Sequence, residues 1–336
     1  MTTLETVEMH TAGEPVRIVV SGFPKLSGDT ILDKRRDARA RFDHLRRALM
    51  HEPRGHADMY GVIPVEPTHP EAVFAALFIH HEGYSTMCGH ATIALGRWLV
   101  ESGRVAAVEP LTRFSIELPC GLVSLACRVE GGRVRATRFE SVPAFLALED
   151  AVVEAAGLGP VTLDVAYGGA FYAVLPASRL GLDLFGTPLE TLRRAAMAIT
   201  EAGRASLAIR HPAAPDLGFL YGTILTDDSP PPRPTSNLCV FADGQIDRSP
   251  TGSGATARMA CDHARGLIGA NVPRAFHGAT GLPFTAEIVG ARGGEGVVVS
   301  VSGASAFTGT ARFTIEDDDP LGHGFVLPGT MHEIAS

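Results

Sequence analysis

The sequence predicts an α+β protein built from two similar halves, each an α/β lobe. Two short glycine-rich segments, residues 87–92 (MCGHAT) and 251–256 (TGSGAT), resemble each other although 160 or so positions separate them. In each half, strand-like stretches precede such a turn and a helix follows it. The length of 336 residues also exceeds what a single small core needs. We therefore expect two lobes with the functional site between them.

The composition narrows the classes of partner. Hydrophobic residues make up 45% of the chain, charged residues 20%, and the formal net charge is −8, values typical of a soluble globular protein. Without an extended basic block or an apolar run of about 20 residues, we expect neither nucleic acid nor a membrane as partner. The five cysteines are odd in number and scattered. This pattern argues against a disulfide framework and predicts a cytoplasmic protein.

The first half alternates strand-like and helical stretches. Apolar residues recur at helical spacing from Ala91 to Leu99, and Ser102 with Gly103 is a typical helix end. The glycine-rich turn of residues 87–92 therefore leads directly into a helix. We expect strands over 7–20, with a turn at 12–15, and over 72–79, 114–118, 123–129 and 133–139, and helices over 31–52 and from 91 to 102.

The second half repeats this order of elements. Residues 164–174 read as a strand pair around two glycines, and residues 227–232 (DDSPPP) read as a solvated loop. Gly266 is the expected end of the second motif helix. We expect further strands over 217–225 and 238–241, and helices over 188–202 and 255–265.

The two glycine-rich helix starts are candidate anion sites. The first backbone N–H groups of a helix have no partner within it, and the helix dipole places partial positive charge there. Facing starts could hold one carboxylate and present Cys88 and Thr251 to opposite faces of the neighbouring atom. A helix start lowers the pKa of a thiol, so we expect Cys88 to act as a base. The hydroxyl of Thr251 can take part in hydrogen bonds but cannot store a proton.

Other motifs are interpreted as structural. Residues 51–56 (HEPRGH) place two histidines five positions apart around a helix-breaking proline and glycine, and His80 and His81 are adjacent. Neither pattern predicts a metal site, so we expect no metal. The chain has no nucleotide-binding fingerprint, because the glycines after Thr251 lack the third glycine and the acidic partner. The remaining cysteines are expected to be structural: Cys120, Cys127, Cys239 and Cys261.

The two motifs together resemble the proline racemase family, which includes hydroxyproline epimerases and trans-3-hydroxy-L-proline dehydratases. The resemblance rests on residues 87–92 and on residues 247–254 (DRSPTGSG). Further matches extend it over nearly the whole chain: residues 10–15 (HTAGEP), 52–56 (EPRGH), 166–169 (AYGG) and 307–310 (FTGT).

The resemblance implies a diaminopimelate-epimerase-like fold, with the site in the cleft between the lobes and no cofactor. We expect an N-terminal lobe over residues 1–158, completed by residues 318–336, and a second lobe over 159–317. The resemblance also implies a small imino acid as substrate, and we expect a homodimer. Racemases and epimerases of the family carry a cysteine at both motif heads. Cys88 with Thr251 is instead the pairing of the dehydratase branch.

The expected reaction is dehydration of trans-3-hydroxy-L-proline to Δ1-pyrroline-2-carboxylate. Cys88 would remove the Cα proton as general base, and Asp247 would hold the ring ammonium. His90 either assists the departing hydroxyl or only binds substrate, and Thr251 is expected to hydrogen-bond substrate or a water. Backbone amides would hold the substrate carboxylate: those of Gly89, His90, Gly252 and Ser253.

Three alternatives stay open at this point. An epimerase or racemase could use a water held by Thr251 as its second acid. A thiol hydrolase would pair Cys88 with a histidine, although His90 is poorly placed for this only two residues away at a helix start. The third alternative is an imino-acid binding protein without catalysis.

Overall fold

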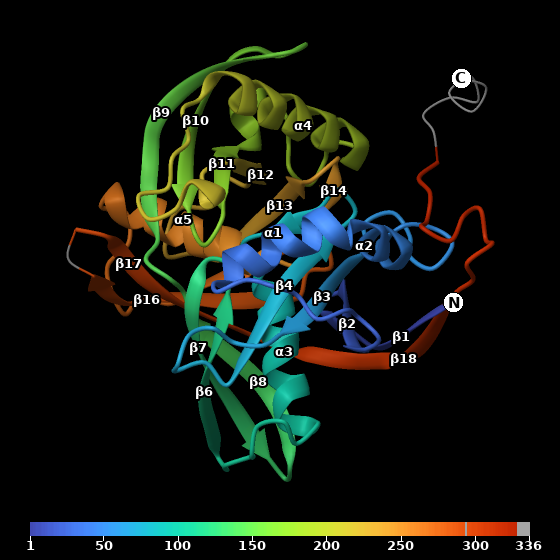
Figure 1. Cartoon of the computed structure of the whole chain (residues 1–336). Helices are drawn as coiled ribbons and strands as arrows, with labels where there is room; N and C mark the ends of the chain where they lie inside the picture. The colour runs from blue at the N-terminus through green and yellow to red at the C-terminus, as the bar shows by residue number, and fades with distance from the viewer. Residues whose placement is uncertain (293, 328–336) are drawn as a thin grey trace.

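The computed structural model describes residues 1–292 and 294–327. Within these residues the two halves of the chain repeat one succession of elements (Figure 1). Each repeat has two strands, a helical segment, two further strands and a very short one. A helix and three more strands complete it. The duplication expected from the two motifs is therefore present in the order of the elements.

The first repeat begins at the N-terminus. Its elements are β1 (Thr2–Thr11), β2 (Glu14–Ser21), α1 (Ile31–Arg41), α2 (Asp43–Met50), β3 (Tyr60–Val65), β4 (Phe74–His80), β5 (Tyr84–Ser85), α3 (Gly89–Glu101), β6 (Leu111–Leu118), β7 (Gly121–Glu130) and β8 (Arg133–Glu140).

The second repeat follows strand β9 (Phe145–Ala155), and strand β18 (Ser305–Ile315) comes after it. Two short 3-10 helices, Ala177–Leu180 and Pro215–Leu217, flank its first helix. Its elements are β10 (Gly159–Tyr167), β11 (Phe171–Pro176), α4 (Leu189–Ser206), β12 (Leu220–Thr226), β13 (Thr235–Phe241), β14 (Gln245–Ile246), α5 (Gly252–Ala264), β15 (Arg274–His277), β16 (Pro283–Arg292) and β17 (Gly296–Gly303).

Strand pairing follows the same plan in both halves. The first half is ordered β18-β1-β2-β3-β4-β6-β7-β8. The second is ordered β9-β10-β11-β12-β13-β15-β16-β17. The parallel pairs are at equivalent places in the two halves. The pair β2 and β3 corresponds to β11 and β12, and the pair β4 and β6 corresponds to β13 and β15. Antiparallel pairing of β8 with β17 joins the halves.

The predicted lobe limits, 1–158 and 159–317 with 318–336 added to the first lobe, stay a prediction. Strand pairing crosses these limits, because β18 pairs with β1 and β9 pairs with β10. Of the terminal segment, residues 328–336 lie outside the described residues.

Helices α3 and α5 lie inside the two halves, whereas α1, α2 and α4 cover outer faces of strands (Figure 1). Eleven of the 13 residues of α3 and ten of the 13 residues of α5 are buried. Apolar helices of this kind are stable only when strands surround them. Their N-terminal ends therefore open into the protein interior rather than into solvent. Among the described residues, no helix has both the length and the apolar character needed to cross a membrane.

A single helix was expected over residues 31–52, but the structure has two helices there, α1 and α2. The expectation of one continuous helix is therefore wrong. Phe42 separates α1 from α2 with φ −129 and ψ 16, outside the helical region. Its ring packs edge-on against Phe23 with centroids 6.1 Å apart. Packing of this aromatic side chain thus overrides the local helical pattern. Helix α1 begins with a capping box between Thr30 and Asp33.

Candidate active site

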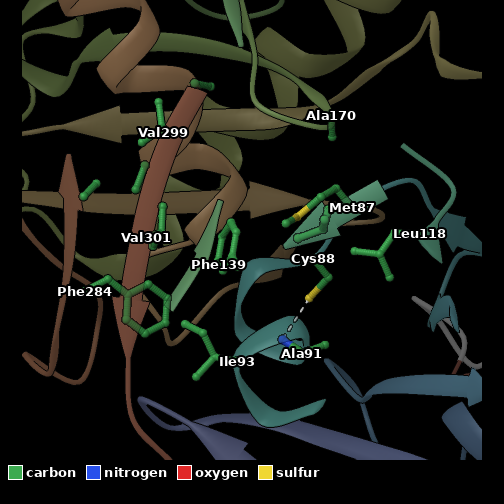
Figure 2. Close-up of a cluster of buried hydrophobic side chains, with 14 of the residues drawn as sticks. Met87, Cys88, Ala91, Ile93, Leu118, Phe139, Ala170, Phe284, Val299 and Val301 are labelled. Atoms are coloured by element: carbon green, nitrogen blue, oxygen red, sulfur yellow. Dashed lines mark hydrogen bonds between the residues drawn. The ribbon is translucent and has the colours of Figure 1, made fainter. Parts of the chain in front are cut away.

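Cys88 and Thr251 occupy equivalent places immediately before α3 and α5, but their backbones differ. Cys88 is extended (φ −145, ψ 110), and its sulfur accepts a hydrogen bond from the Ala91 N–H at 3.4 Å (Figure 2). Thr251 is left-handed (φ 61, ψ 88) and its side chain does not cap the helix. This conformation is a true outlier for a β-branched residue. Backbone strain of this kind persists mainly at functional sites.

The two helix starts touch through their first residues. A Cβ on Gly89 would lie 2.5 Å from the Cα of Gly252, and a Cβ on Gly252 would lie 2.8 Å from the Cα of Gly89. Only glycine permits two backbones to approach this closely. The starts of both helices therefore border one small region, and the shared anion site there stays a prediction.

The predicted site residues border one small cavity. The lining includes all seven of them: Cys88, Gly89, His90, Asp247, Thr251, Gly252 and Ser253. A larger surface groove is lined by none of these seven residues. The structure thus brings the predicted set together, and the roles of its members are argued under the proposed function.

Burial is the main influence on the pKa of Cys88. The side chain is 4% exposed, and desolvation raises the pKa of its thiol well above the ordinary value. The carboxylates of Asp247 and Glu14 raise it further, whereas the N–H of Ala91 lowers it. The sequence predicted that the helix start lowers the pKa of the thiol, and the structure differs because desolvation outweighs the helix start. The role of Cys88 as base stays a prediction.

Asp247 and Thr251 are linked to each other. The Thr251 hydroxyl donates to Asp247 Oδ2 at 2.8 Å, and the Ser249 N–H donates to Oδ1 at 2.8 Å. Asp247 is 3% exposed, and burial raises the pKa of its carboxyl to about 6 against these hydrogen bonds. The sequence did not predict that Thr251 contacts Asp247. The contact explains how a hydroxyl at this motif head orients the carboxylate below it.

Glu14 is a second buried carboxylate beside Asp247. It is 0% exposed, its Oε2 accepts from the Arg248 N–H at 2.8 Å, and its Oε1 has no hydrogen-bond partner among the described residues. Burial, and then the charge of Asp247, raise the pKa of Glu14 well above its ordinary value. Residues 10–15 carried the family resemblance, but their role was not assigned. They tie the first half to the loop that precedes α5.

His90 lies against the sulfur of Cys88, so the expectation that these two residues are poorly placed to face each other is wrong. Its Nδ1 is 3.1 Å and its Nε2 3.6 Å from Cys88 Sγ, and its ring packs edge-on against Tyr60 with centroids 4.7 Å apart. Burial lowers the pKa of the imidazole to about 3, although a hydrogen bond to the backbone of Pro15 opposes the change. His90 is therefore neutral at physiological pH. The Thr11 hydroxyl donates a hydrogen bond to the backbone carbonyl of His90 at 2.9 Å.

Sequence reasoning missed the aromatic walls of the cavity. The missed lining residues are Met87, Tyr60, Tyr172, Tyr221 and Phe241. Met87 heads the motif already quoted, but the other four belong to strands β3, β11, β12 and β13, whose local pattern indicates only burial. A group of apolar rings with few polar atoms is typical of a small-molecule site.

Comparison with known proteins places this geometry in a family. The proline racemase family matches residues 6–326. The chain belongs to the proline racemase family. A trans-3-hydroxy-L-proline dehydratase from Homo sapiens is 52% identical over 334 residues, which cover 96% of this chain and 94% of the relative. A 3-hydroxyproline 2-epimerase from Burkholderia multivorans is 40% identical and covers 96% and 98% of the two chains.

Solved structures confirm the fold of this proline racemase family member. A hydroxyproline epimerase from Agrobacterium vitis, solved with trans-4-hydroxy-L-proline bound, has a TM-score of 0.92 at 26% identity and covers 97% of this chain and 95% of its own. A Pseudomonas aeruginosa protein described as a predicted epimerase has a TM-score of 0.59 at 15% identity, with 93% and 100% covered. The predicted α+β, diaminopimelate-epimerase-like fold of two similar lobes is confirmed.

Proposed function

We propose that this protein dehydrates trans-3-hydroxy-L-proline to Δ1-pyrroline-2-carboxylate and water without a cofactor. One observation carries the proposal: the two helix starts that meet at Gly89 and Gly252 carry a thiol on one side and a hydroxyl on the other. Inversion at Cα requires a proton carrier on each face, whereas elimination requires a base on one face only. The 52% identical human dehydratase supports the same reading.

The substrate binds through its two charged groups. Its ring ammonium pairs with Asp247, each of whose oxygens accepts one hydrogen bond from the protein and can accept another. Its carboxylate faces the backbone N–H groups at the two helix starts, those of Gly89, His90, Gly252 and Ser253. These donors lie in place before substrate arrives, so they also stabilise the charge that develops next to Cα.

Substrate binding itself prepares the base. Cys88 is protonated when buried beside two carboxylates, and a cation bound at Asp247 offsets their charge. The bound ammonium therefore lowers the pKa of the thiol. The thiol releases its proton to solvent as the substrate binds, and the Cys88 thiolate then removes the Cα proton as general base. The C3 hydroxyl leaves, and the resulting enamine tautomerises to the cyclic imine.

The epimerase alternative has less support. A relative 40% identical is a 3-hydroxyproline 2-epimerase, but here the hydroxyl of Thr251 already donates to Asp247. A hydroxyl so engaged does not supply the second titratable group that inversion requires.

Product analysis tests the proposal directly. We would incubate the enzyme separately with trans-3-hydroxy-L-proline, trans-4-hydroxy-L-proline and L-proline, and analyse each mixture by mass spectrometry and chiral chromatography. Loss of one water from the first substrate, with the other two unchanged, is the expected result. Inversion of any of the three at Cα without loss of water would instead establish the epimerase.

We further propose that the protein acts as a homodimer in the cytoplasm. All five cysteines are free, which fits a reducing compartment. Light scattering on the purified enzyme measures the mass directly, and a monomer mass would contradict the dimer. Localisation by fractionation of the source cells tests the compartment.

A further inference from the structure

The phenol of Tyr221 is a buried polar group that the proposed reaction has not yet used. Tyr221 lies in β12, is 5% exposed and lines the catalytic cavity together with Cys88. Its hydroxyl is buried and has no hydrogen-bond partner among the described residues. Buried hydroxyls are normally paired. An unpaired one at the wall of a substrate cavity therefore indicates that its partner is the ligand.

The geometry of the substrate places the leaving group on the side of the base. In trans-3-hydroxy-L-proline the hydroxyl and the carboxylate lie on opposite faces of the ring. The Cα hydrogen is also opposite the carboxylate, so this hydrogen and the hydroxyl share one face. The group that protonates the departing oxygen must then approach from the same face as Cys88. Thr251, at the other helix start, serves the opposite face.

Three polar side chains lie beside Cys88, and two of them already contact other protein groups. The Tyr60 hydroxyl and Ser85 Oγ are 2.6 Å apart and hydrogen-bonded. The ring of His90 has both nitrogens within 3.6 Å of the Cys88 sulfur. Among the described residues that line the cavity, the Tyr221 hydroxyl is the one buried side-chain polar atom without a hydrogen-bond partner.

The ring of Tyr221 is held firmly by its neighbours. It stacks on Phe241 with centroids 5.3 Å apart and an interplanar angle of 24°. Tyr172 and His80 each meet it edge-on, with centroids 5.8 Å away. Burial, and then the charge of Cys88, raise the pKa of Tyr221 well above its ordinary value. The hydroxyls of Tyr60 and Ser85 lie close enough to oppose this change in part. The side chain is thus a fixed phenol that keeps its proton at neutral pH.

We infer that Tyr221 donates the proton with which the C3 hydroxyl departs, an inference that rests on the proposed function. Cys88 takes the Cα proton, the C–H electron pair forms the Cα–C3 double bond, and the C3–O bond breaks toward oxygen. That oxygen takes the Tyr221 proton and leaves as water. The Cys88 thiol then returns its proton to the phenolate, and one N–H proton moves to C3 to give the imine.

The test compares two leaving groups in the Tyr221→Phe variant. Hydroxide requires a proton to leave, whereas chloride does not, so trans-3-chloro-L-proline bypasses the donor. With trans-3-hydroxy-L-proline we expect kcat/KM to fall by about 100-fold or more, the usual effect of losing a general acid. With the chloro compound we expect a much smaller loss. Both reactions give the same imine, which mass spectrometry quantifies.

Tyr167→Phe is the matched control. Tyr167 is also a buried tyrosine whose hydroxyl has no partner among the described residues, but it does not line the catalytic cavity. This variant should keep both activities.

Three outcomes would overturn the inference. The first is an equal fall of kcat/KM with both substrates in Tyr221→Phe. The second is a fall below tenfold with trans-3-hydroxy-L-proline. The third is a Tyr221→Phe variant that fails to fold, because an unpaired hydroxyl should not be needed for folding. If the wild-type enzyme itself forms no imine from trans-3-hydroxy-L-proline, the proposed function is the part that fails.

Discussion

Gly89 and Gly252 bring the two halves of the chain into backbone contact at the starts of α3 and α5. A Cβ on either residue would lie within 2.8 Å of the Cα of the other, a distance that real Cβ atoms do not reach. The contact fixes how far apart Cys88 and Thr251 stand, because each directly precedes one of these glycines. The spacing of the two motif heads is therefore set by backbone rather than by side-chain packing.

Gly89→Ala should abolish turnover while leaving the lobes largely folded. The methyl group must push α3 and α5 apart, and overpacking of this kind costs about 1–3 kcal/mol. The N–H groups would then no longer converge on one carboxylate. Gly269→Ala is the control, since a Cβ there meets nothing within 4 Å. Steady-state kinetics and thermal unfolding of both variants check this, and an active Gly89→Ala enzyme would refute the shared anion site.

Cys88→Ser should be folded and almost inactive. A hydroxyl at this position has far too high a pKa to be the base, even with an ammonium bound beside it. Cys127→Ser is the matched control: Cys127 is equally buried but packs against Thr137, outside the cavity. Initial rates measured by imine formation decide the matter. Activity of Cys88→Ser within about tenfold of wild type, a barrier change near 1.4 kcal/mol, would remove Cys88 as base.

The residues at the two motif heads could be predicted because their signals are local. Glycine-rich turns followed by apolar residues at helical spacing predict buried helix starts, and α3 and α5 begin at Gly89 and Gly252 as expected. The role of Glu14 was not predictable in the same way. Its contact with the Arg248 N–H joins positions 234 residues apart, and only the pairing of the strands brings them together.

Tyr60 and Tyr221 show where sequence reasoning stops. Tyr60 lies among four consecutive buried residues of β3, and every residue of β12 is buried, so periodicity does not distinguish a cavity wall from ordinary core. The direction in which the pKa of Cys88 changes was missed for a related reason. The helix start is visible in the sequence, but the burial that raises the pKa of the thiol depends on the whole fold.

The activity should rise with pH through the titration of Asp247. Burial raises the pKa of this carboxyl to about 6, and only its charged form attracts the substrate ammonium. In the free enzyme, kcat/KM should therefore increase between about pH 5 and 7. It should keep increasing above pH 7 because the pKa of Cys88 is raised as well. A kcat/KM that is constant over the acidic range would contradict the role of Asp247.

Asp247→Asn should make the protein inactive but more stable at neutral pH. The native pKa of about 6 exceeds the unfolded value of 3.8, so the free energy of unfolding falls as pH rises through this interval. Above this interval the buried charge of Asp247 lowers the free energy of unfolding by about 3 kcal/mol. The amide of Asn carries no charge and so removes this destabilisation, while its oxygen still accepts the hydrogen bond from the Ser249 N–H. Thermal unfolding near pH 8 should show a higher Tm for the variant than for wild type.

Asp164→Asn provides the opposite case for that experiment. Asp164 is paired with Arg265 at 2.6 Å, and this pairing lowers the pKa of its carboxyl although burial opposes it. Its charge contributes stability above the unfolded pKa, so the variant should have a lower Tm near pH 8. If both variants shift Tm in the same direction, the buried charge of Asp247 is not what limits stability.

Thr251→Cys should convert part of the dehydratase activity into epimerisation. The change places a titratable group on the second face of Cα and leaves the N–H groups of Gly252 and Ser253 in place. It also removes a β-branched side chain from a left-handed residue (φ 61), so the fold should tolerate it. Dehydration should fall because the hydrogen bond from Thr251 to Asp247 at 2.8 Å is lost.

The decisive substrate for Thr251→Cys is trans-4-hydroxy-L-proline, which has no leaving group next to Cα. Chiral chromatography after long incubation should show its Cα epimer with Thr251→Cys and none with wild type. The double variant with Cys88→Ser should again form none, because inversion requires both thiols across one carbon. Rapid epimerisation by wild type would overturn the dehydratase assignment. Epimer formed by the double variant would show that Cys88 is not one of the two proton carriers.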